Sequence, residues 1–192
     1  MSSDIVDQAI KVLIGGGIVI YPTDTAFGIG CRVDSRDAVD RLFTIRRRPL
    51  VKATPVLVDS MDMALTYYSS PLPIVRHLMK TYWPGALTVV APANIDLLYS
   101  PIRGGSPNVG LRMPSHEVPL ALVGGVGVPI LGPSANFHDS KTPYKFEDLD
   151  PDLVKLVDLV IPGECSVGVA STVVDCSVEP YKIIRQGSVY LE

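Results

Sequence analysis

The segment YPTDTAFGIGC, residues 21–31, sets three small polar side chains between two apolar runs. Both runs, Gly17–Tyr21 and Ala26–Val33, are typical of buried strands. Ligands in open α/β sheets bind beyond the ends of strands, and PTDT offers hydroxyl and carboxylate groups at such an end. The same residues would also fit a turn closed by an Asx cap. The segment therefore predicts two strands with either a ligand site or a tight turn between them.

The composition is that of a globular protein with an ample core. The chain has 192 residues, of which 47% are hydrophobic, and a formal net charge of −3. This length fits one domain over residues 1–192, and the charge provides no general attraction for nucleic acid. The start of the chain lacks a basic segment, so we expect no signal peptide. The longest uncharged run, residues 118–137, contains prolines and glycines and predicts no membrane span.

The three cysteines, Cys31, Cys165 and Cys176, are far apart and form no CxxC pair. This pattern predicts neither a disulfide framework nor a zinc site, and it favours a reduced, cytoplasmic location. The three histidines, at positions 77, 116 and 138, show no metal-ligand spacing either. We therefore expect no protein-bound metal and no Ser/His/Asp triad.

Hydrophobic periodicity predicts helices and strands along the whole chain. The expected helices cover residues 4–14, the segment between Ser35 and Pro49, and residues 61–69, 72–83, 116–123 and 148–157. The expected strands are residues 17–21 and 26–33, TPVLV, ALTVVAPA, NVGLRMP, the start of VPILGPSAN, DLVIP, STVVDCS and YKIIRQG. The glycine- and proline-rich PIRGGSP, residues 101–107, predicts a surface loop or flap. Helices and strands alternate without a regular βαβ rhythm, which favours a single α/β domain with a twisted mixed sheet.

A cationic motif, IRRRPLVK, follows the helix that begins after Ser35. In an extended segment alternate residues share a face, so Arg46 and Arg48, with Lys52, would converge while the arginine between them points away. Guanidinium groups match phosphate oxygens in pairs, which makes the motif a candidate phosphate site. The alternative is a solvated helix end whose positive charge interacts favourably with the helix dipole.

Two further segments place polar groups at strand ends. In GPSAN, Ser134 and Asn136 point the same way and offer hydrogen bonds to phosphate or ribose oxygens, and a plain polar loop is the alternative. In GLRMP, Arg112 lies within an apolar strand, and a buried arginine needs an anion or a carboxylate. That partner is either a ligand or a structural carboxylate such as Asp175. The chain has no GxxxxGK[ST] loop and no GxGxxG before a helix, so a nucleotide site would use these side chains.

Seven segments, taken in order, resemble the YrdC/TsaC family of threonylcarbamoyl-AMP synthases. They are YPTDTAFGIGC, RLFTIRRRP, YWPGALTVV, VGLRMPSH, GPSAN, STVVD and IIRQG, and the resemblance spans about residues 5–189. It implies a twisted mixed α/β sheet, flanked by helices, around a concave basic pocket. It also implies a nucleotidyltransferase that uses L-threonine, bicarbonate and ATP, with Mg²⁺ on the ATP, to form threonylcarbamoyl-AMP and pyrophosphate. Proteins of a threonylcarbamoyl-transferase complex would then pass the group to tRNA.

The resemblance also implies roles for individual residues. It assigns the catalytic cations to Arg46 and Arg48. It implies that ATP is bound by Arg48, Lys52, Asn108, Ser134, Asn136, Thr142 and Arg185. It implies that threonine is held by Thr25, Leu57, Arg112, Gly132 and Ser171, of which Leu57 and Gly132 act through the backbone. PTDT would thus form part of the amino-acid pocket.

Three positions depart from the family pattern. Arg46 replaces the usual lysine, KAT at Lys52–Thr54 replaces K-P-L, and Ala170 replaces the glutamate of E-S-T-V. These departures favour, as the main alternative, a non-catalytic or divergent YrdC-like protein that binds RNA or ribosomes. Carbamoyl-adenylate chemistry of the hydrogenase-maturation type is a weaker alternative. The chain ends soon after IIRQG and so resembles the short form of the family, and no residue stands out as a general base.

Overall fold

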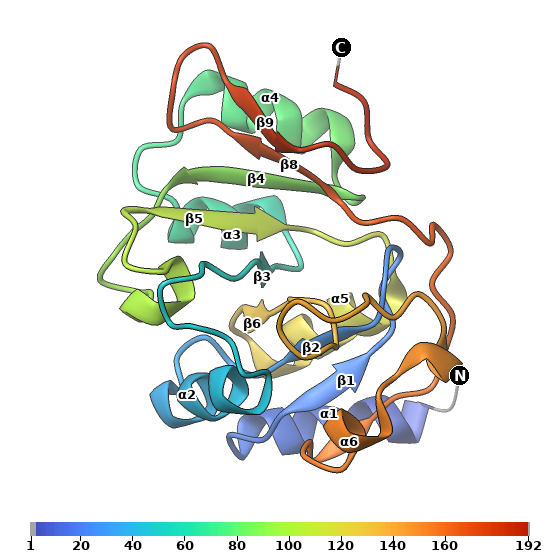
Figure 1. The fold of residues 1–192 in the computed structure, drawn as a ribbon. Coiled ribbons are helices and arrows are strands. Elements are labelled where there is room, and N and C mark those ends of the chain that lie inside the picture. Colours follow the sequence, from blue (N-terminus) through green and yellow to red (C-terminus); the bar gives the residue numbers. More distant parts are fainter. Residues whose placement is uncertain (1–2, 192) are drawn as a thin grey trace.

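The computed structural model of the protein describes residues 3–191, which form two β-sheets flanked by helices (Figure 1). The larger sheet contains β3 (Val56–Leu57), β4 (Leu87–Pro92), β5 (Asn108–Arg112), β6 (Ile130–Leu131), β8 (Thr172–Asp175) and β9 (Lys182–Arg185). The smaller sheet contains β1 (Val19–Tyr21), β2 (Gly28–Gly30) and β7 (Leu159–Val160). The helices are α1 (Ser3–Ile14), α2 (Arg36–Ile45), α3 (Met61–Tyr67), α4 (Pro73–Tyr82), α5 (Glu117–Val126) and α6 (Pro151–Val154), with short 3-10 helices η1 (Ser100–Arg103) and η2 (Phe146–Asp148). The predicted fold class, an α/β fold with a mixed sheet flanked by helices, is confirmed, although the strands form two mixed sheets where one was expected.

The larger sheet has the strand order β6-β3-β5-β4-β8-β9. β3 is parallel to β5 and β4 to β8, whereas β3–β6, β4–β5 and β8–β9 are antiparallel. Helices α3 and α4 cover one face of this sheet (Figure 1). Because β5 runs against β4 and β8, its C-terminal end lies beside their N-terminal ends. This register brings Thr88, Arg112 and Ser171 to the same edge.

The smaller sheet has the order β2-β1-β7, with β1 antiparallel to β2 and parallel to β7. Helix α1 packs against α5 and β1. Isolated bridges join the two sheets, one between Gly28 and Ser134 and one between Arg32 and Ile130. The PTDT segment follows β1 directly, so it lies at the seam between the sheets.

The helices follow the predicted periodicity more closely at their starts than at their ends. Helix α5 continues beyond the predicted 116–123 and ends at Gly127, whose φ of 74° is the left-handed conformation that glycine favours after a helix. The predicted helix at 148–157 is wrong in extent. Asp150 caps a helix that begins at Pro151, where proline fits the first turn, and this helix ends at Val154. No helix of residues 3–191 is long and apolar enough to cross a membrane.

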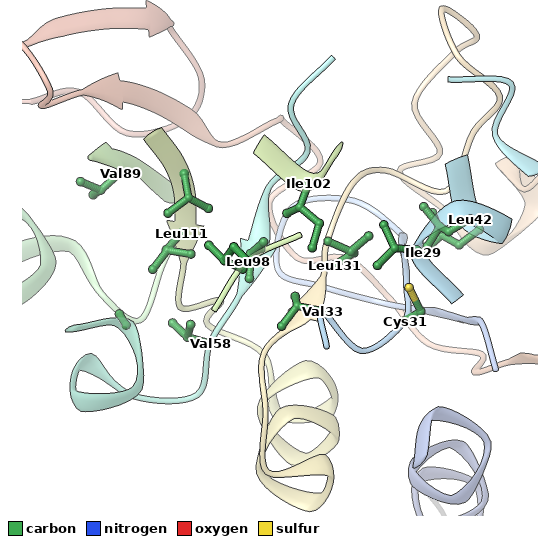
Figure 2. Close-up of a cluster of buried hydrophobic side chains, with 14 of the residues drawn as sticks. Ile29, Cys31, Val33, Leu42, Val58, Val89, Leu98, Ile102, Leu111 and Leu131 are labelled. Atoms are coloured by element: carbon green, nitrogen blue, oxygen red, sulfur yellow. The ribbon is translucent and has the colours of Figure 1, made fainter. Parts of the chain in front are cut away.

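Buried apolar side chains from both sheets meet in one cluster (Figure 2). Ile29 of β2, Leu42 of α2 and Leu131 of β6 belong to it, which ties the smaller sheet and the end of α2 to the larger sheet. Ile102 of η1 is also fully buried there. The prediction of a surface loop at PIRGGSP is therefore wrong for its first residues, because η1 anchors them in the core.

Candidate active site

A cavity of about 170 Å³ lies at the seam between the two sheets. Its wall contains most of the predicted site residues, namely Thr25, Arg46, Arg48, Leu57, Arg112, Gly132, Ser134, Thr142, Ser171 and Arg185. Thr88 of β4 also lines it and was missed by the sequence analysis. Its signal was a single hydroxyl in the otherwise apolar strand ALTVV. The fold thus brings together polar groups from every quarter of the chain.

Three of the predicted residues lie outside this wall. Asn136 turns its side-chain amide toward the backbone oxygen of Ser140, at 2.7 Å. Lys52 is exposed in the segment after α2. Asn108 begins β5, whereas Arg112 ends it, so the two are about 13 Å apart at 3.3 Å per residue. Any contact of these residues with a ligand would be made beyond the cavity.

The PTDT segment forms a turn and part of the cavity wall. Thr23 closes the turn, because its Oγ1 donates to the Ala26 oxygen at 2.7 Å and accepts from the backbone N–H groups of Thr25 and Ala26. The predicted Asx cap is therefore wrong, since a threonine holds the turn. Asp24 does not line the cavity and accepts a hydrogen bond from Arg112, whereas Thr25 lines the cavity. The turn and ligand-site interpretations are thus compatible.

Arg112 is held on three sides at the base of the cavity. It forms an ion pair with Asp24, donates from Nη1 to Thr25 Oγ1 at 2.7 Å, and donates from Nε to the Gly85 oxygen at 3.0 Å. Burial lowers its pKa, Asp24 opposes this, and the charge of Arg185 lowers the pKa further. A guanidinium has five N–H groups, so two remain for a ligand carboxylate.

The suggestion of Asp175 as the structural partner of Arg112 is wrong. Asp175 accepts from Ser177 Oγ at 2.6 Å at the end of β8. Asp24 takes the role instead, and both members of its pair with Arg112 are buried, at 3% and 6% exposed.

The arginine triplet, residues 46–48, turns where α2 ends. Arg46 is the C-cap, and Arg47 has a φ of 52°, in the left-handed region. Arg46 and Arg48 line the cavity, while Arg47 packs over the Phe137 ring at 4.4 Å. The predicted divergence of Arg47 is confirmed, but its cause is a left-handed turn and not an extended segment.

The arginine triplet also pairs with the end of the GPSAN segment. Arg46 Nε donates to the Asn136 oxygen at 3.1 Å, and the His138 N–H donates to the Arg46 oxygen at 2.8 Å. Arg48 Nη1 lies 3.4 Å from His138 Nδ1. These contacts hold both cavity-facing arginines from the same side. The sequence did not indicate a role for His138, apart from its position just after GPSAN.

Arg46 is a buried cation for which the described residues supply no ion-pair partner. It is 2% exposed, and its Nη1 has no hydrogen-bond partner among residues 3–191. Burial lowers its pKa to about 10, and the neighbouring charge of Arg48 lowers it too. A buried charge is normally paired, so this wall is suited to an anion.

Arg48 is engaged by its own loop. Its Nε donates to the Lys52 oxygen at 3.2 Å and its Nη2 to the Ala53 oxygen at 2.6 Å. A phosphate bound to Arg48 would have to replace these neutral acceptors. Charged acceptors form hydrogen bonds about twice as strong as neutral ones, so the exchange is favourable.

A second polar corner lies across the cavity. Ser171 Oγ lies 3.0 Å from Thr88 Oγ1 and accepts from Arg185 Nη2 at 3.0 Å, while Arg185 Nε donates to the Ser171 oxygen. This corner joins β4, β8 and β9 and stands beside Arg112. The cavity can therefore hold a carboxylate with hydroxyl groups at one side and phosphate oxygens at the other.

Comparisons with known proteins agree on one family. A profile for Sua5, YciO and YrdC proteins, described as "Telomere recombination", matches residues 11–187. A threonylcarbamoyl-AMP synthase of Bacillus subtilis is 34% identical over 188 residues, 96% of this chain and 54% of that protein. The crystal structure of Pyrococcus abyssi Sua5 complexed with L-threonine superposes with a TM-score of 0.90 at 30% identity, covering 95% of this chain and 54% of that one. Escherichia coli YciO superposes with a TM-score of 0.86 at 26% identity, covering 96% and 89%. The chain spans about half the length of the first two proteins.

Proposed function

The chain belongs to the Sua5/YciO/YrdC family, and on that premise we propose that it is an L-threonylcarbamoyladenylate synthase. In this proposal it uses L-threonine, bicarbonate and ATP to form threonylcarbamoyl-AMP and pyrophosphate, and so acts as a nucleotidyltransferase. The observation that carries the proposal is the cavity itself. Its lining includes Arg112 and Thr25, which suit an amino acid, and Arg46, whose buried Nη1 has no partner among residues 3–191 and which suits an anion.

We propose that the threonine carboxylate binds the two remaining N–H groups of Arg112. The substrate hydroxyl would bond to Thr25 or Ser171, and the aliphatic Leu57 would lie near its methyl group. The phosphates would lie against Arg46, Arg48 and Arg185, with Ser134 and Thr142 as neutral donors. Guanidinium groups match phosphate oxygens in geometry as well as in charge.

The proposed reaction has two steps. The threonine amine attacks the carbon of bicarbonate, which forms the N–C bond of a carbamate and releases water. A carbamate oxygen then attacks the α-phosphorus of ATP, and pyrophosphate leaves. Such a transfer depends mainly on positioning and on stabilising negative charge, which a cluster of arginines supplies. Partial shielding of the reactants from water in the cavity would also slow the return of the carbamate to amine and bicarbonate.

The cavity volume supports this division of the ligands. About 170 Å³ is below the roughly 300–1,000 Å³ of sites for drug-sized molecules. It suits an amino acid and the adjacent phosphates, so we propose that the nucleoside of ATP extends past the rim. Lys52 is exposed beyond the wall and would be free to meet the nucleoside there, whereas Asn136 would first have to give up its hydrogen bonds to the Phe137 and Ser140 oxygens.

Magnesium is proposed only as part of the ATP complex. Among residues 3–191 no group of histidine, cysteine and acidic side chains could hold a metal ion. Mg²⁺ takes oxygen ligands, and the described wall of the cavity offers no carboxylate. The residues present therefore do not form a magnesium site, and the steps above involve none.

We also propose a cytoplasmic location for the enzyme. All three cysteines are free thiols, which supports a reducing, cytoplasmic location. There the adenylate would pass to proteins of a threonylcarbamoyl-transferase complex and then to tRNA.

Pyrophosphate release tests the proposed function. The protein is incubated with Mg-ATP and bicarbonate, together with threonine, serine, 2-aminobutyrate or no amino acid. We expect threonine to be best and serine to be about 10–200-fold poorer, because a missing methyl is worth about 1–3 kcal/mol. 2-Aminobutyrate should fare worse still, since it leaves the hydroxyl partners unpaired. The same low rate in all four reactions would refute the proposal and favour a non-catalytic RNA-binding protein.

A further inference from the structure

Thr88 contributes a buried hydroxyl to the cavity wall. It lies in β4 and is 3% exposed. Its Oγ1 lies 3.0 Å from the Oγ of Ser171, the residue that directly precedes β8. Among residues 3–191 this contact is the one hydrogen bond that the Thr88 hydroxyl makes. Thr88 and Ser171, here called the hydroxyl pair, therefore share one part of the cavity wall.

The side chain of Thr88 is held in one orientation by its neighbour on β5. A Cβ on Gly110 would lie 3.2 Å from the methyl carbon Cγ2 of Thr88, which is closer than ordinary contact. The methyl group thus packs against the space that glycine leaves open. Because threonine is branched at Cβ and stiff about χ1, this packing keeps the hydroxyl directed toward Ser171. The hydroxyl pair is therefore fixed by the sheet as well as by its own hydrogen bond.

The hydroxyl pair has one proton left to donate. Each hydroxyl has one proton and two acceptor lone pairs. The bond within the pair uses one proton and one lone pair, and Arg185 Nη2 donates to a second lone pair, on Ser171 Oγ, at 3.0 Å. One proton and two lone pairs remain, whichever of the two hydroxyls donates to the other. The two oxygens can therefore both donate to and accept from a single ligand group.

This arrangement is compatible with phosphate bound at Arg185. The Nε of Arg185 donates to the Ser171 backbone oxygen, and its Nη2 donates to Ser171 Oγ. A guanidinium has five N–H groups, so the three that remain after these two can meet phosphate oxygens. The hydroxyl pair thus keeps its unused proton whether the nucleotide is bound or not.

Thr25, the other hydroxyl considered for the substrate, is better suited to the carboxylate. Its Oγ1 accepts at 2.7 Å from Nη1 of Arg112, the residue proposed to hold that carboxylate. The Thr25 proton could go to Thr23 Oγ1 at 3.2 Å, but that oxygen already accepts from two backbone N–H groups. The proton is therefore available to join Arg112 at the carboxylate, which leaves the substrate hydroxyl to the hydroxyl pair.

We propose that Thr88 is a specificity-determining residue, which together with Ser171 recognises the substrate hydroxyl as both donor and acceptor. The inference rests on the proposed function and identifies the groups that select L-threonine. The substrate hydroxyl would receive the unused proton of the pair and donate to one of its free lone pairs. A methyl group or a hydrogen in the same place would leave a buried O–H without a partner, which disfavours binding. The site therefore selects a hydroxyl in one configuration at the β carbon.

Calorimetry of the ATP-free wild type with three amino acids tests the proposal. L-Threonine is compared with 2-aminobutyrate, which lacks the hydroxyl, and with L-allo-threonine, which has the hydroxyl and the methyl group exchanged at the β carbon. We expect both analogues to bind at least about 100-fold more weakly than threonine, because a site that hydrogen-bonds a hydroxyl rejects ligands that leave it unpaired. A smaller difference for either analogue would overturn the proposal.

Two substitutions of Thr88 separate its hydroxyl from its shape. Thr88→Val keeps the branched shape and should lower the preference for threonine over 2-aminobutyrate by about tenfold, the effect of about one hydrogen bond. Thr88→Ser keeps the hydroxyl and should retain the preference of the wild type. In pyrophosphate release, Thr88→Val should raise the KM for threonine with little change in kcat, because the hydroxyl is bound alike in the ground and transition states. An unchanged preference in Thr88→Val, or an equal loss in Thr88→Ser, would show that this hydroxyl does not select the substrate.

The outcomes also separate this inference from the proposed function. If threonine binds and supports pyrophosphate release, but Thr88→Val leaves the preference unchanged, the inference alone is overturned. If threonine neither binds nor supports pyrophosphate release, the amino-acid site itself is wrong and the proposed function is refuted as well.

Discussion

Replacing Arg46 by methionine should stabilise the empty protein while abolishing its activity. Arg46 is 2% exposed, and its Nη1 lacks a partner among the described residues. Burial, followed by the charge of Arg48, lowers its pKa to about 10. The folded protein therefore holds this charge at a cost, and the cost is recovered only when an anion binds.

The magnitude follows from the pKa. A lowering from 12.5 to about 10 corresponds to about 3 kcal/mol at about 1.36 kcal/mol per pH unit. Because the folded pKa of this cation lies below the unfolded one, the penalty is fully present below pH 10 and fades as the pH rises above it. Methionine is unbranched and fills much of the same space, but it leaves the Asn136 oxygen without its donor at 3.1 Å, which costs about 1–2 kcal/mol. The net gain is about 1 kcal/mol, or about 2–4 °C in Tm for a chain of this size.

Thermal unfolding at pH 7, with and without pyrophosphate, measures both parts of the prediction. Pyrophosphate at 100 times its Kd should stabilise the wild type by about 2.7 kcal/mol and the Arg46→Met variant by much less. Arg47→Met is the matched control, because it removes a charge from the same turn but from outside the cavity. The reasoning is refuted if Arg46→Met is less stable than the wild type without ligand and gains as much from pyrophosphate.

Two more substitutions test the roles of the arginines. Arg48→Ala should lower the rate of pyrophosphate release by at least about a hundredfold, as does the loss of a single charge-stabilising donor in other active sites. The urea unfolding midpoint should change little, because the partners of Arg48 are exposed loop carbonyls. A near-normal rate would contradict its place at the phosphates. Arg46→Lys should keep the rate within about tenfold of the wild type, or about 1.4 kcal/mol in activation free energy, because the site needs a cation there. A larger loss in steady-state assays would mean that the planar guanidinium makes a paired contact that lysine cannot make.

Local patterns of apolar residues predicted most helices and strands, and the wrong predictions also have causes in the local sequence. The apolar spacing of α2 was sufficient, since the apolar residues that recur at helical intervals are the ones that the helix buries, namely Ala38, Val39, Leu42, Phe43 and Ile45. The predicted helix at 148–157 failed because a proline at 151 fixes where a helix can begin and the following residues do not extend it. The buried Ile102 was missed because PIRGGSP has turn composition, which says nothing of what one apolar side chain can reach.

The site depended on pairings that no local pattern carries. The order of the motifs predicted most residues of the cavity wall. The partner of Arg112 was predicted wrongly, because Asp24 lies 88 residues away in the sequence and reaches Arg112 only through the arrangement of the two sheets. The Thr88–Ser171 contact likewise follows from the parallel register of β4 and β8. Such contacts are set by strand order, which the sequence leaves open.

The opening segment, YPTDTAFGIGC, links the seam to the cavity through its glycines. A Cβ on Gly30 would meet the Leu131 oxygen and lie 2.9 Å from the Tyr21 hydroxyl, and a Cβ on Gly28 would lie 2.9 Å from the Tyr21 ring. That hydroxyl donates to the Leu131 oxygen at 2.7 Å, which fastens β1 to β6 across the seam. A side chain at Gly30 would therefore push the sheets apart, and one at Gly28 would displace the Tyr21 ring that carries this hydroxyl. Since Thr25 lies in the turn between β1 and β2 of the smaller sheet and Arg112 ends β5 of the larger one, we expect their 2.7 Å contact to be lost as well. The glycines hold the sheets close enough for the polar turn between them to complete the amino-acid corner.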